Sequence, residues 1–412
     1  MKDLYILLIS LFVFTFSNAQ IVDIPDTNFK NALVNTLCVA SEYQGDPFTS
    51  VDFNNDGEIQ VSEAETIVHL QVSLQNISSL EGIEAFTSLK SLACGANQLS
   101  VLDMSSNTLL EYLSCGSNEI NLLNVTQNLN LIELHCSVNN LQTIDVTQNT
   151  NLIKFYCGLN LLENIDLSQN LLLEDFLAFN NQISSINLNN NINLRSCVLE
   201  FNNLVSIDFS YNIDLSLLIL FNNNLTHLDL SNNLELNQLG CDNNPLTGTL
   251  DLSQNENLFG LSCTNTLISS LNLRNGDNIN LTRMWAQDNP NLTCIQVDDI
   301  NFANSQDCDL NGSSGWCKDE TVIYSEDCNL GIEDVLQKQI SLYPNPAKDV
   351  LYLYNESISE ISTIKVYDIL GEQVLQKNNP INQIDISNLA TGLLFVQIET
   401  DKGLVIKKII KQ

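Results

Sequence analysis

The chain has 412 residues, of which 44% are hydrophobic and 16% are charged, and its formal net charge at pH 7 is -33. Almost all of the excess acid lies before residue 339, so this larger part should repel phosphate backbones and anionic lipids. The composition therefore argues against a nucleic-acid-binding protein. It leaves two readings open: calcium or a cationic partner, or charge that serves only solubility.

Residues 1–19 predict a secretory signal peptide. Lys2 precedes an apolar run, and the small residues Ser17 and Ala19 stand just before Gln20, where cleavage is expected. No later stretch reaches the roughly 18 uninterrupted apolar residues that a membrane helix needs. We therefore expect an exported chain with no transmembrane segment after the signal is removed.

Residues 20–86 precede a repeated region and predict an N-terminal cap. In "DTNFKNALVNTL", Phe29, Leu33 and Leu37 are spaced four apart, which indicates an amphipathic helix with Asp26 as its N-cap. The helix is expected to end near Leu37.

The segment "DFNNDGEIQVSE", residues 52–63, fits the twelve-residue calcium-loop pattern D-x-[DN]-x-[DN]-G-x5-E. It resembles an EF-hand loop, although only one loop is present and the predicted helix ends well before it. Gly57 provides the sharp turn. The oxygen ligands expected for a structural calcium ion are Asp52, Asn54, Asp56, the backbone carbonyl of Glu58, Gln60 and Glu63. The alternative is a metal-free, hydrogen-bonded acidic turn.

Asparagine recurs every 21 residues through the middle of the chain. The first row is Asn97, Asn118, Asn139, Asn160, Asn181, Asn202, Asn223 and Asn244. A second row, ten residues further on, is Asn107, Asn128, Asn149, Asn170, Asn191, Asn212, Asn233 and, after one inserted residue, Asn255. The unit reads LxxLxCxxNxLxxLDLSxNxx, so each turn contains two similar halves.

This unit resembles the leucine-rich repeat family, specifically its nested 21-residue bacterial type, over residues 87–298. The resemblance implies a β-rich solenoid of short parallel strands, here with about ten turns. Leucines of one turn cannot be buried alone, but stacked turns share a continuous core. Asparagine suits the turns because its amide can satisfy backbone groups, so both rows are expected to be internal scaffolds.

A cysteine row at Cys94, Cys115, Cys136 and Cys157 shares this spacing, and alanine, leucine and cysteine fill the same slot in later turns. Neighbouring parallel strands lie about 4.8 Å apart with parallel side chains, which does not suit a relaxed disulfide. A straight row of thiols also cannot supply the tetrahedral ligands of zinc. We expect buried thiols that pack as small apolar side chains.

Outward positions beside the first half-strand collect apolar and aromatic residues on the middle turns. The predicted partner-binding residues are Tyr112, His135, Tyr156, Leu177, Phe179, Val198, Ile219 and Phe221. A contiguous apolar patch commonly marks an interaction site. The alternatives are that a cap, a loop or a second copy covers these residues. The outward row of the second half-turn, Asp103 to Asn272, is expected to form a hydrogen-bonded ladder and not cation sites.

Residues 299–332 lose the period and predict a C-terminal cap, followed by a linker at 333–338. An exported solenoid must cover its last turn, and the last four cysteines of the chain, Cys294 and the three within this cap, form an even cluster that indicates disulfides. Four cysteines allow three pairings; Cys294 with Cys328 and Cys308 with Cys317 is favoured because nested bonds close the cap onto the final strand.

Residues 339–412 alternate apolar and polar side chains between turn signals, which predicts a small antiparallel β-sandwich that ends in a hairpin. The motifs "LYPNPAKD", "VYDILGEQV", "IDISNLATG" and "GLVIKKIIK" strongly resemble the type A C-terminal sorting domain of the type IX secretion system. The resemblance implies contact with that secretion machinery and export across the outer membrane, to the cell surface or into the medium.

Three histidines without metal-ligand spacing, and the lack of a phosphate loop or nucleophile elbow, predict that the chain is not an enzyme. The combined reading is an exported leucine-rich-repeat protein that mediates protein recognition or adhesion. The alternatives are a glycan-binding adhesin, favoured by solvent-facing rings with polar neighbours, and a structural component of a surface layer.

Overall fold

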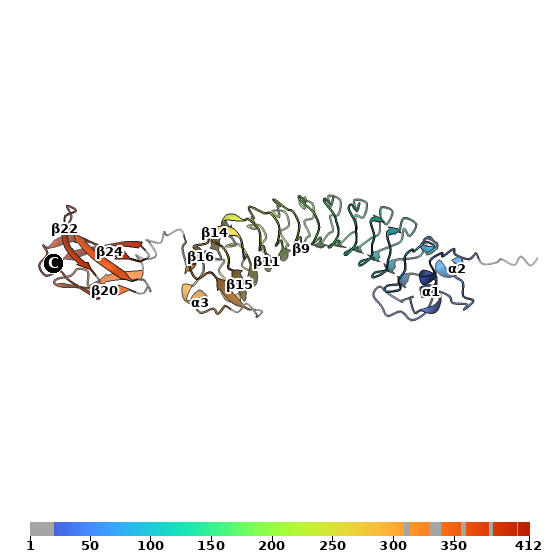
Figure 1. Cartoon of the computed structure of the whole chain (residues 1–412), viewed down its shortest axis with the longest axis horizontal. Coiled ribbons are helices and arrows are strands. Elements are labelled where there is room, and N and C mark those ends of the chain that lie inside the picture. The colour runs from blue at the N-terminus through green and yellow to red at the C-terminus, as the bar shows by residue number, and fades with distance from the viewer. Residues whose placement is uncertain (1–19, 309–313, 329–338, 356–359, 379–381, 402) are drawn as a thin grey trace, which may run out of the picture. The chain divides into compact units, whose positions relative to one another are not determined.

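The computed structural model describes residues 20–308, 314–328, 339–355, 360–378, 382–401 and 403–412 (Figure 1). The chain divides into two compact units, which are described separately: residues 1–292 with 306–320, and residues 293–305 with 321–412. The predicted signal peptide at 1–19 and the predicted linker at 333–338 lie outside the described residues. None of the helices within the described ranges is long and apolar enough to cross a membrane.

The N-terminal cap contains two short helices, α1 (Thr27–Asn35) and α2 (Val61–Ala64). Asp26 caps α1 as predicted, because its carboxylate accepts hydrogen bonds from the backbone N–H groups of Asn28 and Phe29, at 2.9 Å each. Phe29 and Leu33 are fully buried, so the apolar face of α1 anchors the cap.

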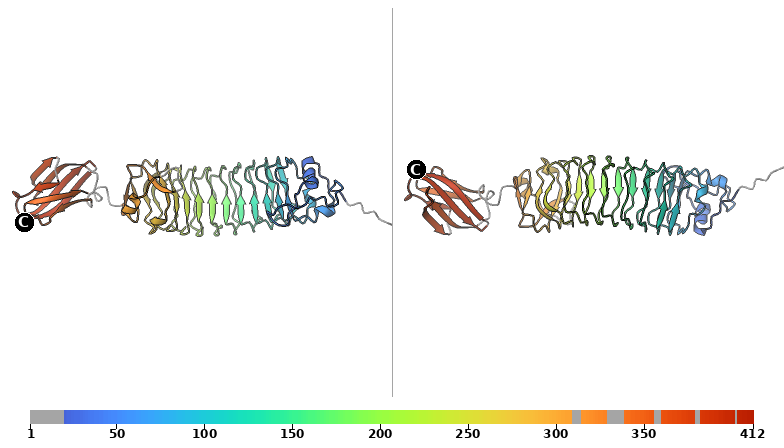
Figure 2. Two further views of the ribbon diagram at one scale, coloured as in Figure 1. Left: turned by 90° about the horizontal axis from the view of Figure 1, so that it is seen from below. Right: turned by 90° about the horizontal axis from the view of Figure 1, so that it is seen from above.

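One parallel sheet runs along the first unit, and in the described chain it has twelve strands. Its members, in spatial order, are β1 (His69–Gln71), β2 (Ser91–Ala93), β4 (Tyr112–Ser114), β6 (Glu133–His135), β7 (Lys154–Tyr156), β8 (Asp175–Leu177), β9 (Ser196–Val198), β10 (Leu217–Ile219), β11 (Gln238–Gly240), β13 (Gly260–Ser262), β15 (Arg283–Ala286) and β17 (Gly315–Lys318). The turns stack into an arc with this sheet along its inner edge (Figure 1), and the strands lie side by side in Figure 2. The predicted solenoid is thus confirmed.

The second half of each turn contains less regular structure. Two short parallel pairs occur there, β3 (Val101–Asp103) with β5 (Leu122–Asn124) and β12 (Thr247–Asp251) with β14 (Leu267–Asn272). Two 3-10 helices, η1 (Ile83–Ala85) and η2 (Asn278–Asn280), complete the turns of this unit.

The core of the solenoid consists of stacked inward side chains. The predicted cysteine row is confirmed as core: Cys94, Cys115, Cys136 and Cys157 are free thiols with no exposed surface. Burial raises the pKa of Cys115 to about 12. These thiols therefore remain protonated and act as small apolar groups.

The first asparagine row is hydrogen-bonded on both sides of its amide. In Asn139, the side-chain Oδ1 accepts from the N–H of Ile120 at 2.9 Å, and Nδ2 donates to the carbonyls of Cys115 and Cys136 at 3.1 and 3.0 Å. The second row only donates: Asn149 Nδ2 reaches two carbonyls, whereas its buried Oδ1 has no partner. Both rows join each turn to the turn before it.

The second unit begins with a small cap. Strand β16 (Cys294–Gln296) pairs in parallel with β18 (Ile323–Ser325), and α3 (Ile300–Asn304) lies between them in sequence. A disulfide joins Cys294 and Cys328 in this unit, and another joins Cys308 and Cys317 in the first unit. These are the nested pairs that the sequence favours.

The C-terminal segment forms two antiparallel sheets, which confirms this part of the predicted fold class. One sheet contains β19 (Ile340–Tyr343), β20 (Val350–Asn355) and β23 (Gln383–Asp385); the other contains β21 (Ile361–Tyr367), β22 (Gln373–Asn378), β24 (Gly392–Thr400) and β25 (Gly403–Lys411). The last two strands form the expected terminal hairpin. Buried residues from both sheets make up one core.

Candidate binding surface on the solenoid

The outward side of the middle strands bears the apolar stripe, which we define as Tyr156, Leu177, Phe179, Val198, Ile219 and Phe221. Tyr156, Leu177, Val198 and Ile219 are the third residues of β7 to β10, and the strand register places each one beside the next. The two phenylalanines follow β8 and β10 by two residues. All six side chains are half-buried. The structure therefore brings these six predicted residues together on one face.

Glycines on neighbouring turns let the large side chains of the stripe lie close to the backbone. A Cβ atom at Gly158 would lie 2.5 Å from Cε1 of Phe179, so the ring occupies the space that a side chain would need. A Cβ atom at Gly240 would lie 3.3 Å from Cδ1 of Ile219 and 3.7 Å from Cδ1 of Phe221, so these side chains also pack against a glycine. The rings are therefore fixed by packing, which favours a preformed surface.

The cap covers part of the sheet on the N-terminal side of the stripe, where the predicted binding residue Tyr112 lies. The ring of Tyr43 stacks on that of Tyr112 with centroids 3.9 Å apart, and the Tyr43 hydroxyl donates to Glu133 Oε2 at 2.9 Å. Burial, together with this hydrogen bond, raises the pKa of Tyr43 to about 12. His135 stacks on Tyr156 at 4.4 Å. One face of Tyr112 is thus already occupied within the protein.

Charged residues lie beside the N-terminal half of the stripe, at the first positions of β6, β7 and β8 (Glu133, Lys154 and Asp175), whereas β9 and β10 begin with Ser196 and Leu217. Lys154 Nζ lies 3.0 Å from Glu133 Oε1, and this hydrogen bond raises the pKa of Lys154. Burial raises the pKa of Asp175, whose Oδ2 accepts from the Tyr156 hydroxyl at 3.5 Å. The stripe is thus an apolar centre with a charged rim on this side, the arrangement typical of protein interfaces.

The C-terminal end of the same face is polar. The guanidinium of Arg283 lies 5.0 Å from the ring centroid of Trp285, a cation–π contact. Asp242 Oδ1 accepts hydrogen bonds from the hydroxyls of Ser262 and Thr264. These residues were not predicted as site residues. They lie on the same outward rows as the stripe, where the residue type changes from turn to turn, and this variation is the sequence signal that could have identified them.

The predicted calcium loop is closed by hydrogen bonds to its own backbone. The Asp52 carboxylate accepts from the N–H groups of Asp56 and Gly57 at 3.1 and 2.9 Å. Glu63 accepts from the N–H groups of Phe53 and Gln60 at 2.9 and 3.0 Å. The loop therefore folds around its acidic side chains.

The remaining predicted ligands lie in the same loop. Asn54 Nδ2 donates to Asp56 Oδ2 at 3.0 Å and to Gln60 Oε1 at 2.8 Å, whereas the side chain of Glu58 pairs with Lys30 at 2.5 Å. Within the described residues, no three His, Cys, Asp or Glu side chains form a group that could hold a metal ion. The flanking helices are also not those of an EF-hand, because α1 ends at residue 35 and α2 has four residues.

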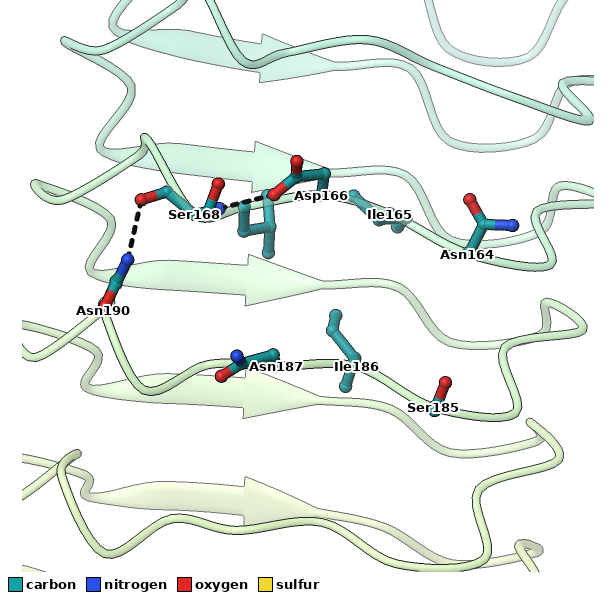
Figure 3. A pocket seen from close by; sticks show the side chains of 9 residues that line it. Asn164, Ile165, Asp166, Ser168, Ser185, Ile186, Asn187 and Asn190 are labelled. Carbon is teal, nitrogen blue, oxygen red and sulfur yellow. Dashed lines mark hydrogen bonds between the residues drawn. The ribbon is translucent and has the colours of Figure 1, made fainter.

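A shallow hollow of about 450 Å³ lies on the second half-turn, between residues 164–168 and 185–190 (Figure 3). Its carboxylate, Asp166 Oδ1, accepts from the N–H of Ser168 at 2.9 Å, and Asn190 Nδ2 donates to the Ser168 carbonyl at 3.0 Å. Ser105, Thr147 and Ser210 donate in the same way to the aspartates two residues before them. The outward aspartates are thus hydrogen-bonded within their own turns, and Asn124 and Asn272 also donate to Asp103 and Asp251 on the preceding turns, at 3.0 Å each.

Comparison with known proteins supports both parts of this architecture. The family model described as the secretion system C-terminal sorting domain matches residues 341–412. Among solved structures, the functional domain of InlJ from Listeria monocytogenes, which includes a cysteine ladder, has a TM-score of 0.52 and 21% identity and covers 95% of this chain and 98% of its own. An internalin, InlF, from the same organism has a TM-score of 0.43 and 18% identity, and the match covers 67% of this chain and 92% of the internalin chain. No curated protein matches the chain.

The sorting-domain match assigns the destination of the chain, which is the outer cell surface or the exterior. The likeness to InlJ, at this identity, shows the fold. The protein is therefore an exported protein with a leucine-rich-repeat fold and a secretion system C-terminal sorting domain.

Proposed function

We propose that the protein recognises another protein through the apolar stripe, and that its role is binding and not catalysis. The observation that carries the proposal is the unbroken series of half-buried apolar residues at the third positions of β7 to β10, in a chain with a net charge of -33. A contiguous apolar patch on the outward side of a sheet commonly marks an interaction site.

The chemistry of the stripe suits a protein ligand. Tyr156, Phe179 and Phe221 supply rigid aromatic area, which dominates the binding energy of many interfaces. The Glu133–Lys154 pair and the Arg195–Glu174 pair, at 3.0 and 3.6 Å, lie beside it. Such rim charges contribute orientation and association rate more than affinity.

A glycan ligand is the second candidate, and the stacking contacts favour it less. Sugar rings are held by aromatic faces that are open to solvent. Tyr43 covers Tyr112, and His135 and Tyr156 stack on each other, so three of these rings each have a face in use. The apolar centre with a charged rim supports protein recognition over both the glycan adhesin and a purely structural surface-layer role.

We also propose that a calcium ion binds the loop from Asp52 to Glu63 and stabilises the cap. Asn55 and Gly57 adopt φ values of 62° and 85°, in the left-handed region, and Gly57 stands at the position where a calcium loop of this pattern makes its sharp turn. Calcium prefers such carboxylate and amide oxygens. Its role would be structural, because the loop contributes no group to the apolar stripe.

The proposed recognition is tested with a variant that carries Tyr156→Ala, Phe179→Ala and Phe221→Ala. Partners are captured from extracellular extracts, identified, and then purified so that affinity can be measured by calorimetry. A matched control carries Val101→Ala, Leu122→Ala and Val205→Ala, three side chains that are 52%, 58% and 57% exposed outside the stripe. We expect the stripe variant to bind at least about tenfold more weakly. Equal affinity of both variants and the wild type would refute the proposal.

A further inference from the structure

A second apolar surface lies on the solenoid, at the residue that follows each asparagine of the second row. We call it the edge row: Leu129, Thr150, Leu171, Ile192, Ile213 and Leu234, on six successive turns. Its five aliphatic side chains are between 51% and 57% exposed, whereas no member of the apolar stripe is among the exposed apolar side chains. The edge row is therefore more exposed to solvent than the proposed recognition surface.

The neighbours of the edge row are almost uncharged. One flanking row, just before the buried asparagines, is Gln127, Gln148, Gln169, Asn190, Tyr211 and Asn232. The other, just after the edge row, is Asn130, Asn151, Leu172, Asn193, Asp214 and Glu235. Only the last two of these residues are charged. An aliphatic centre with an amide-rich border is the composition of an interface core and rim.

The charge of the chain narrows the choice of occupant. Two copies with a net charge of -33 each repel wherever their acidic surfaces meet. The edge row is a band where two copies can approach without placing carboxylates opposite each other. Anionic lipids and nucleic acids are repelled by the rest of the chain. A second copy of this chain is thus the occupant that the charge pattern fits.

We propose that two copies pair through their edge rows in an antiparallel arrangement with two-fold symmetry. The axis passes between the turns of Leu171 and Ile192, so each of these residues faces the other in the second copy. The acidic end of the row then meets the neutral end: Asp214 lies opposite Asn151, and Glu235 opposite Asn130. A parallel pair would instead bring like carboxylates together, at a cost that a symmetric contact must avoid.

The size of the row sets the expected strength. Six turns at about 4.8 Å give a contact roughly 24 Å long and only a few side chains wide. A stable interface buries about 800 Å² on each partner, which the aliphatic residues reach only with help from Tyr211, Leu172 and the flanking amides. We therefore expect a reversible dimer whose population rises with concentration.

Sedimentation velocity of the purified full chain over a wide concentration range tests the proposal. The wild type should shift from monomer to dimer. The double variant Leu171→Glu with Ile192→Glu should weaken dimerisation at least about tenfold, because it places like charges opposite each other. Val205→Glu is the matched control, since Val205 is 57% exposed and lies off the row. Thermal unfolding checks that all variants remain folded.

A charge-pair experiment tests the antiparallel register. Leu171→Lys and Ile192→Glu should each weaken self-association, and a mixture of the two variants should form a heterodimer more readily than either forms a homodimer. A mixture that behaves like the separate variants would refute this register. A wild-type chain that remains monomeric, or a Val205→Glu variant that loses the dimer equally, would refute the dimer. A monomer that sediments with phosphatidylcholine vesicles would assign the row to a membrane surface instead.

Discussion

The imidazole of His135 stacks on the phenol ring of Tyr156 with 4.4 Å between centroids, and its Nε2 lies 3.7 Å from Glu133 Oε2. Burial lowers the pKa of His135 below its usual 6.5, and the Glu133 carboxylate offsets only part of this effect. Its position on the sheet therefore favours the neutral imidazole over the protonated imidazolium. This contact links the cap-covered end of the sheet to the apolar stripe.

A pH dependence follows from that shift. Because the folded pKa is lowered, the contribution of His135 to stability is fully present above pH 6.5 and is lost as the pH falls through the folded pKa. The His135→Phe variant should lose less thermal stability than the wild type when the pH is lowered from neutrality. His227→Phe, at an exposed position, is the control and should follow the wild type. Parallel pH profiles of all three proteins would contradict this prediction.

The two asparagine rows should differ in their contribution to stability. Asn181 accepts from the N–H of Leu162 and donates to three carbonyls, one of them at 3.4 Å, so Asn181→Ala removes four hydrogen bonds and should cost about 2–4 kcal/mol. Asn191 only donates, and its Oδ1 has no partner, so Asn191→Ala should cost about 1–2 kcal/mol. Urea unfolding measures both. A larger loss for Asn191→Ala would show that the hydrogen-bond assignment is wrong.

In the cysteine row, a substitution that introduces a polar side chain should lower stability more than a substitution that only removes the sulfur atom. Cys136 is fully buried, and burial raises its pKa well above the usual value, so the folded protein should not react with a thiol reagent at this position. Cys136→Ala should cost about 1 kcal/mol. Cys136→Ser should cost about 1–3 kcal/mol more, because a hydroxyl is buried without an assigned partner. Rapid labelling of Cys136 in the folded state would contradict its core position.

Calcium should raise the melting temperature of the chain if the proposed loop site exists. The comparison is thermal unfolding with calcium and with a chelator, for the wild type and for Asp56→Ala. Asp56 Oδ1 accepts from the Glu58 N–H at 2.9 Å, so the variant also loses a turn contact and defines the metal-free baseline. Identical melting in calcium and chelator for the wild type would leave the loop as a hydrogen-bonded turn.

The periodic residues explain why so much of the fold was predictable. Asn97 and its successors mark every turn, and their spacing places leucine and cysteine inside and Tyr156 or Ile219 outside. Periodic packing needs no long-range information, because each turn contacts only its neighbours. The C-terminal sheets were predictable for a different reason, since their motifs resemble those of the sorting domain that matches residues 341–412.

Features outside the period were not predictable from the same pattern. The sheet continues into the two predicted caps through β1 and β17. On the N-terminal side the spacing between turns is 22 residues instead of 21, with Gln75 at the place of the first-row asparagine. On the C-terminal side β17 comes after a non-repeating insertion that contains α3. The stacking of Tyr43 on Tyr112 depends on how the cap folds back onto the sheet. The edge row does repeat every 21 residues, but none of its residues lies in a strand.

Site-specific photocrosslinking tests the recognition surface most directly. A photoreactive phenylalanine is placed at Leu177 or Ile219 of the apolar stripe, and at Val205 as an exposed control outside it. The purified partner is then added and the crosslinked residues are mapped by mass spectrometry. We predict protein crosslinks from both stripe positions and none from Val205. A partner that crosslinks to Val205 and not to the stripe would contradict recognition through this face.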